Sequence, residues 1–160
     1  MNTQKCKHGL SLIEILMVIV IIAVLAAMVV TVATSVDNQS KEEEVKTTFS
    51  LLEAALQEYK EFRNVFPEQP LKDFTNVAAH SEYLYGELSS IPNSQMILEK
   101  INASLIKQNV DTGSIPPVPE IYDPWGTVID YRYTISDTFP ELVSAGPDRI
   151  FGNADDISNK

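Results

Sequence analysis

The first quarter of the chain contains one long apolar run. Residues 15–36 span 22 positions without a charged residue, a glycine or a proline. An α-helix rises about 1.5 Å per residue, so the run would form a helix of roughly 33 Å, whereas a bilayer core is about 30 Å thick. The pattern therefore predicts a transmembrane helix.

The charges on either side of the run predict its orientation. Lys5 and Lys7 precede it, and four acids follow it closely, namely Asp37, Glu42, Glu43 and Glu44. The positive-inside rule then places the N-terminus in the cytoplasm and the following domain across the membrane. A cleaved secretory signal is disfavoured, because its apolar region is about 7–15 residues and ends at an A-x-A site. Here Ala26-Ala27 lies in the middle of the run.

A second helical pattern follows the apolar run. Hydrophobic residues recur every three or four positions, which is the period of an amphipathic helix packed on a core. The stripe comprises Val45, Phe49, Leu52, Leu56, Tyr59 and Arg63, flanked by Leu51, Ala55, Phe62 and Phe66. Ser40 and Glu43 form a capping-box pattern, which predicts a slight break at 37–40. Phe66-Pro67 is expected to end the helix.

The rest of the chain predicts two short helices and a small sheet. A short helix is expected within 75–88, and a second over 93–108, where Met96, Ile97, Ile101, Leu105 and Ile106 have helical spacing. A turn at 123–126 precedes an alternating strand at 127–134, and a second strand is expected at 141–144. Trp125, Tyr131 and Tyr133 are the aromatic core candidates of this hairpin. The fold class is therefore α+β.

The composition and the absence of known motifs argue against several classes of function. The chain has 12 basic and 22 acidic residues, a formal charge of −10 and no basic cluster, which argues against nucleic-acid binding. Cys6 is the sole cysteine, so neither an intramolecular disulfide nor a thiolate zinc site can form. His80 has no second ligand at helical spacing and is interpreted as a packing or surface residue. No phosphate loop, GxSxG or HExxH motif occurs, and the chain is not expected to be an enzyme.

Glu14 is the exception beside the apolar run. An acid at this position either reaches the headgroup layer or has a partner and a role. The surrounding sequence, Gly9-Leu10-Ser11-Leu12-Ile13-Glu14 after a short basic leader, resembles the prepilin-type processing motif of type IV pilins and type II secretion pseudopilins. The resemblance implies that a prepilin peptidase cuts between Gly9 and Leu10 and that Leu10 is then methylated. Glu14 would be the fifth mature residue and would pair with the Leu10 amine of a neighbouring subunit.

The resemblance also implies an organisation and a function. Residues 1–9 would be the leader, 10–36 the transmembrane and assembly helix, and 37–157 a periplasmic domain with a pilin-like fold. Leader removal would take away Lys5, Lys7 and Cys6 and change the formal charge from −10 to −12. The sequence departs from the family in having Leu10 where Phe is usual and Thr31 where Pro is usual. The second departure argues against a proline kink in the assembled helix.

The implied protein is a structural subunit, most similar to the major pseudopilin of type II secretion. It would be anchored once in the inner membrane and would polymerise in the periplasm with copies of itself and other pseudopilins, on an inner-membrane assembly platform. A type IV pilin used in adhesion, motility or DNA uptake is the alternative within this class. A membrane-anchored periplasmic binding or enzymatic domain is the alternative from a different class, and it would need convergent polar groups in a pocket.

An acidic segment near the C-terminus is the candidate metal site. Asp148, Asp155 and Asp156 lie within nine positions, and Gly146, Pro147 and Gly152 allow the chain to turn. Ca²⁺ takes about 6–8 oxygen ligands, but the spacing is not that of an EF-hand, so spacing alone favours a solvated tail. Major pseudopilins have a calcium loop at this place, and the resemblance implies a structural Ca²⁺. The ligands would be side chains of Asp148, Asp155 and Asp156, carbonyls of Ala145 and Phe151, and Asn153.

Overall fold

A computed structural model describes residues 12–69, 74–109, 112–113 and 116–160, without the side chains of residues 29–35. The chain divides into two compact units, Met1–Gln39 and Ser40–Lys160. Helix α1 (Leu12–Arg63) contributes its first part to the first unit and its remainder to the second. The helix includes residues 37–40, so the expected break there is not present.

In the first unit, the large apolar side chains of α1 are exposed on all sides. Between Leu12 and Met28 their exposed fractions range from 44% at Ile15 to 83% at Leu12. A helix that is apolar all round requires an apolar surrounding or partner, because water does not stabilise such a surface. Among the described residues, however, no helix is both long and apolar enough to cross a membrane.

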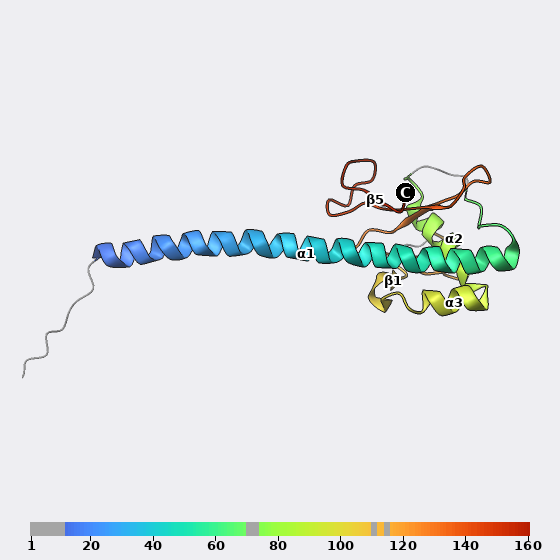
Figure 1. Cartoon of the computed structure of the whole chain (residues 1–160), viewed down its shortest axis with the longest axis horizontal. Helices are drawn as coiled ribbons and strands as arrows, with labels where there is room; N and C mark the ends of the chain where they lie inside the picture. The colour runs from blue at the N-terminus through green and yellow to red at the C-terminus, as the bar shows by residue number, and fades with distance from the viewer. Residues whose placement is uncertain (1–11, 70–73, 110–111, 114–115) are drawn as a thin grey trace, which may run out of the picture. The chain divides into compact units, whose positions relative to one another are not determined.

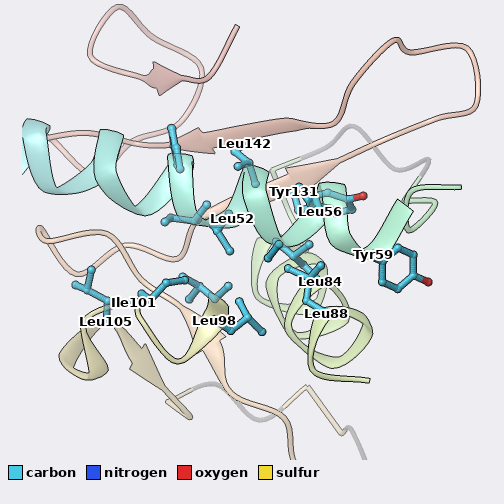
Figure 2. Packing of buried hydrophobic residues seen from close by; sticks show 14 of the residues in the cluster. Leu52, Leu56, Tyr59, Leu84, Leu88, Leu98, Ile101, Leu105, Tyr131 and Leu142 are labelled. Carbon is cyan, nitrogen blue, oxygen red and sulfur yellow. The ribbon is translucent and has the colours of Figure 1, made fainter. Parts of the chain in front are cut away.

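In the second unit, the predicted stripe of α1 is the centre of the core. Val45, Phe49, Leu52, Leu56 and Tyr59 are buried, as their spacing predicted. Figure 2 shows Leu52, Leu56 and Tyr59 among side chains from α2, α3 and the sheet. The end of the stripe was predicted wrongly, since Arg63 is exposed and Phe62 is 65% exposed.

Helix α1 ends at Arg63, before the predicted stop at Phe66-Pro67. The cause is Asn64, which has φ 63° and donates its backbone N–H to the Lys60 carbonyl at 2.7 Å. Asn tolerates this left-handed conformation and so closes the helix in the manner of a C-terminal cap. Phe66 then turns back into the core, where it contacts the rings of Tyr133 and Phe139 edge-on at 5.2 and 5.0 Å.

The remaining elements of this unit surround the C-terminal part of α1 (Figure 1). Helix α2 (Val77–Ser89) confirms the helix expected within 75–88. Helix α3 (Pro92–Leu98) is much shorter than the expected 93–108 helix, and its N-cap is Ile91. After it, the Asn102 side chain accepts the Ser104 N–H and starts the short 3-10 helix η1 (Ala103–Leu105).

Two small antiparallel sheets complete the α+β fold. Strands β1 (Ile106–Lys107) and β2 (Glu120–Ile121) form one pair, which the sequence did not indicate. The second sheet has the order β3-β4-β5. Its strands are β3 (Asp130–Arg132), β4 (Glu141–Ser144) and β5 (Ile157–Ser158). The β4 strand has the predicted bounds, and β3 is shorter than predicted.

The aromatic core candidates are largely confirmed. Trp125 is 5% exposed and Tyr131 is fully buried, while Tyr133 is partly buried against the same cluster. The Tyr131 hydroxyl donates to the Pro67 carbonyl at 2.5 Å, which ties the segment after α1 to β3. Burial raises the pKa of Tyr131, so the phenol remains a donor over the working pH range.

Candidate functional site

The predicted processing and assembly residues divide between described and undescribed parts of the chain. Gly9 and Leu10 lie outside the described residues. Glu14 lies in the first turn of α1 and is exposed beside Leu12 and Ile13. A carboxylate in the first turn interacts favourably with the positive end of the helix dipole. The same position places the acid at the end of a helix whose neighbouring side chains are apolar.

The acidic C-terminal loop lies between β4 and β5 (Figure 1). Its first half is organised by Asp148, whose Oδ1 accepts the Ile150 N–H at 2.9 Å. The other oxygen, Oδ2, accepts a hydrogen bond from Asn153 Nδ2 at 2.7 Å. The structure therefore brings together Asp148 and Asn153, two of the predicted metal ligands.

The second half of the loop depends on Asp155 and Asp156. Asn153 Oδ1 accepts the Asp155 N–H at 2.8 Å, and Asp156 Oδ2 accepts the Gly152 N–H at 2.7 Å. Asp156 Oδ1 is buried and has no hydrogen-bond partner among the described residues. A buried carboxylate oxygen without a donor is costly, so this atom fits a cation ligand.

The other predicted ligands differ in exposure. Ala145 is fully buried, Phe151 is half-buried, and Asp148, Asn153 and Asp155 are exposed. Within the described part of the chain, no group of three or more His, Cys, Asp or Glu side chains is arranged to hold a metal ion. The loop offers oxygen donors of the hard type that Ca²⁺ prefers, but backbone carbonyls would have to contribute to the set.

Gly146 allows the two ends of the loop to approach each other. Its φ is +67°, and a Cβ placed there would lie 2.1 Å from the Asp155 carbonyl oxygen. No side chain fits that space, because the obstructing atoms belong to the backbone. The loop conformation therefore requires glycine at this position.

The start of the loop is fixed by a buried carboxylate in the preceding turn. Asp123 Oδ2 accepts the Ser144 hydroxyl at 2.7 Å, and its Oδ1 accepts the N–H groups of Trp125 and Thr127 at 3.0 and 2.8 Å. Ser144 Oγ in turn accepts the Gly146 N–H at 3.2 Å. Burial raises the pKa of Asp123, and these hydrogen bonds partly oppose the increase.

The end of the loop is held by Asn159, which the sequence did not single out. Its Nδ2 donates to Glu53 Oε1 on α1 at 2.9 Å and to the Pro140 carbonyl at 3.2 Å. Its Oδ1 accepts the Leu142 N–H of β4 at 2.9 Å. Both ends of the acidic loop are thus attached to the core by side-chain hydrogen bonds.

A buried polar cluster that the sequence pattern did not indicate joins α2 to β3. His80 Nδ1 on α2 and Asp130 Oδ1 on β3 are 2.7 Å apart, and Arg132 Nε donates to Asp130 Oδ2 at 2.5 Å. His80 is 1% exposed and Asp130 is fully buried, so substrate has no access to this pair. The interpretation of His80 as a packing residue agrees with this position. The alternating pattern gave no sign that Asp130 is buried.

A groove beside α2 does not bring together a set of catalytic side chains. It has a volume of about 450 Å³, and its lining includes Glu82 and Glu87. Glu82 accepts the Thr112 hydroxyl, and Glu87 accepts the Tyr59 hydroxyl at 2.5 Å. These two carboxylates therefore take part in hydrogen bonds that join segments of the domain.

Comparison with known families identifies the N-terminal segment. Residues 4–30 match the family described as "Prokaryotic N-terminal methylation motif". The chain therefore has a prepilin-type N-terminus, as the residues from Gly9 to Glu14 indicated. The match includes Gly9, Leu10 and Glu14 and the first part of the apolar run.

A comparison with solved structures finds a similar protein. It is the major pseudopilin from the type 2 secretion system of enterohaemorrhagic Escherichia coli, a crystal structure. The sequence identity is 18%, the TM-score is 0.43, and the alignment covers 79% of this chain and 87% of that chain. No curated protein sequence matches this chain.

Proposed function

We propose that this chain is a non-catalytic, pilin-like structural subunit, most similar in role to the major pseudopilin of type II secretion. The observation that carries the proposal is a prepilin-type motif followed at once by a helix whose apolar side chains are exposed all round. Such a helix is stabilised either in lipid or against identical helices. In a subunit that moves from membrane to filament, lipid would stabilise the helix before assembly and neighbouring helices would stabilise it afterwards.

In this proposal, maturation prepares the N-terminus for assembly. The prepilin peptidase cleaves between Gly9 and Leu10 on the cytoplasmic side and methylates Leu10. Cleavage removes Lys5 and Lys7, so the apolar helix then starts with a single ammonium group. The mature subunit is anchored once in the inner membrane by residues 10–36, and residues 37–157 form the periplasmic domain.

Assembly pairs Glu14 with the Leu10 ammonium of a neighbouring copy. Glu14 is exposed in the first turn of α1, where a second chain can reach it. An unpaired charge inside a bundle of apolar helices would cost several kcal/mol, so about this much free energy separates correct from incorrect axial register. The filament grows with other pseudopilins on an inner-membrane platform and drives protein export across the outer membrane.

The experiment compares Glu14→Ala with Glu61→Ala, which removes an exposed acid from the other end of the same helix. Filaments are counted by electron microscopy, and the mature N-terminus is identified by mass spectrometry. We expect a methylated Leu10 in all proteins, few or no filaments for Glu14→Ala, and normal filaments for Glu61→Ala. Normal assembly of Glu14→Ala would refute the pairing, and an intact Met1 would refute processing and leave a tethered domain.

A secretion assay separates the two filament types. If the subunit belongs to a secretion system, deletion of its gene stops export of folded proteins to the medium. A type IV pilin would instead affect adhesion, motility or DNA uptake while export continues. The second outcome would retain the assembly mechanism and change the biological role.

We further propose that the loop between β4 and β5 holds a structural Ca²⁺. The side chains involved are those of Asp148, Asp155 and Asp156, and the carbonyls of Ala145 and Phe151 and the side chain of Asn153 complete the set. The support is twofold: Asp156 Oδ1 is buried without a hydrogen-bond partner in the described part of the chain, and both loop ends are attached to the core. When bound, the ion would neutralise carboxylates of the loop and close a loop that has no apolar core of its own.

The calcium test measures thermal unfolding with added Ca²⁺ and with chelator. At a hundredfold excess over the dissociation constant, a ligand that binds only the folded state stabilises it by about 2.7 kcal/mol. We expect this stabilisation in the wild type and in Glu61→Gln, and its loss in Asp156→Asn. Equal unfolding temperatures of the wild type in Ca²⁺ and in chelator would refute the metal site.

A further inference from the structure

Three side chains from distant parts of the sequence form a stack beside the acidic loop. The guanidinium carbon of Arg132 lies 4.0 Å from the centre of the Phe74 ring. The Phe74 ring is stacked on Phe151, with 4.7 Å between ring centres and an angle of 14° between the planes. Arg132 belongs to β3, Phe74 precedes α2, and Phe151 lies in the acidic loop.

The arginine end of the stack is fixed in the core. Arg132 Nε donates to Asp130, which is fully buried and also contacts His80 of α2. Arg132 Nη2 is buried and has no hydrogen-bond acceptor among the described residues. Within the ranges that the structure describes, the Phe74 ring face is the contact recorded for this part of the cation, and a desolvated cation–π contact of this kind is favourable.

The aromatic end of the stack reaches a part of the loop that has no strand pairing. Pairing of β4 with β5 involves residues 143–144 and 157–158, so the loop tip is held by other contacts. A Cβ on Gly152 would be 3.9 Å from Phe74 Cε2, so the backbone next to Phe151 also lies against this ring. The stack thus connects the loop tip to β3.

We propose that Phe74 and Arg132 are positioning residues for the acidic loop, and that their stack on Phe151 orders the loop tip before any cation binds. The inference rests in part on the proposed calcium site, because Phe151 contributes a carbonyl there. Its ring fixes the residue that carries this carbonyl, while Asp148 and Asp156 orient the neighbouring N–H groups. A site ordered in advance loses less conformational entropy on binding.

The variants act on the stack without removing a proposed ligand side chain. Phe74→Leu removes the ring that joins Arg132 to Phe151, and Phe74 is 38% exposed, so the core is little affected. Phe74→Tyr keeps the ring and should restore wild-type behaviour. Phe62→Leu is the matched control, because Phe62 is an exposed ring that lies 5.9 Å from the Arg63 guanidinium, outside the loop.

Two measurements on the full-length chain in detergent separate the possible outcomes. The first is hydrogen exchange in chelator at the amides of Ile150, Gly152 and Asp155, and the second is calorimetric titration with Ca²⁺. Phe74→Leu loses both the aromatic pair with Phe151 and the cation–π contact with Arg132. We therefore expect about tenfold faster amide exchange in the loop and about tenfold weaker Ca²⁺ binding in this variant. The exchange of amides in α2 should not change.

Unchanged loop exchange in Phe74→Leu would overturn the proposal, as would equal effects in Phe62→Leu or a failure of Phe74→Tyr to restore protection. If the wild type binds no Ca²⁺ but the exchange result is as expected, the calcium assignment fails and the positioning role stands. If Ca²⁺ binds with the same affinity and protection in wild type and Phe74→Leu, the calcium assignment stands and the positioning role fails.

Discussion

Replacing Gly146 by alanine tests whether the close approach of the loop ends determines the stability of this region. The perturbation has two parts. The φ of +67° is unfavourable for any residue with a Cβ, and the new Cβ would lie 2.1 Å from the Asp155 carbonyl oxygen and 3.0 Å from its carbonyl carbon. Because these are backbone atoms, no side-chain rotation relieves the overlap, and the two segments must separate.

The cost follows from these two parts. The left-handed conformation costs about 1–2 kcal/mol for a residue with a side chain. Separation of the segments also strains the hydrogen bonds on either side, from Gly146 N–H to Ser144 and from Asp155 N–H to Asn153, each worth about 1 kcal/mol. The total loss of unfolding free energy is about 2–4 kcal/mol, which corresponds to roughly 8–16 °C for a domain of this size.

The assay is thermal unfolding followed by the fluorescence of Trp125, the single tryptophan, which is 5% exposed in the second unit. Gly126→Ala is the matched control, because Gly126 has φ +91° but no atom within 4 Å of an added Cβ. It should lose about 1–2 kcal/mol, from the backbone conformation alone. If Gly146→Ala is no less stable than Gly126→Ala, the close approach does not contribute and the reasoning is wrong.

Three further changes test other contacts of the domain. Burial raises the pKa of Asp123 in the folded state above its ordinary value of 3.8, so the folded state holds the proton more tightly than the unfolded state. The wild type therefore loses stability as the pH rises from 3.8 through the raised pKa. In urea unfolding at a series of pH values, Asp123→Asn should lack this pH-dependent loss of stability. If unfolding free energy plotted against pH gives parallel curves for the wild type and the variant, the reasoning is wrong. Asn159→Ala loses its hydrogen bond to Glu53 and should cost about 1–3 kcal/mol, measured as an earlier urea midpoint. Tyr131→Phe leaves the Pro67 carbonyl without its donor and should cost about 1–2 kcal/mol at unchanged m-value, and an unchanged midpoint would count against that bond.

Features that depend on residues close together in the sequence could be predicted from the sequence. The buried stripe of α1 followed from its 3.6-residue period, because residues three and four apart share a helix face. The strand Glu141–Ser144 was predicted with the bounds that the structure shows. The motif around Gly9 and Glu14 is also local, because it is a short contiguous segment, and residues 4–30 match a known family.

A prediction from local spacing was wrong where tertiary contacts changed the end of a helix. The apolar spacing over 93–108 predicted one helix, but the chain leaves the helix after Leu98 so that Ile101 and Leu105 can both enter the core. Asn102 then bonds to Glu44 on α1 at 2.8 Å and fixes the new direction. Helical spacing of apolar residues cannot distinguish one continuous helix from a short helix followed by a bend, because a short bend preserves the apolar pattern.

Only the tertiary structure decided which polar residues meet. His80 and Asp130 are 50 positions apart and form a buried pair, and Phe74 lies against Phe151 of the acidic loop. Single residues of these types are common, and nothing near them in the sequence marks a partner. The local order of residues determines periodicity and short motifs, whereas the path of the whole chain determines which distant side chains come within hydrogen-bonding or stacking distance.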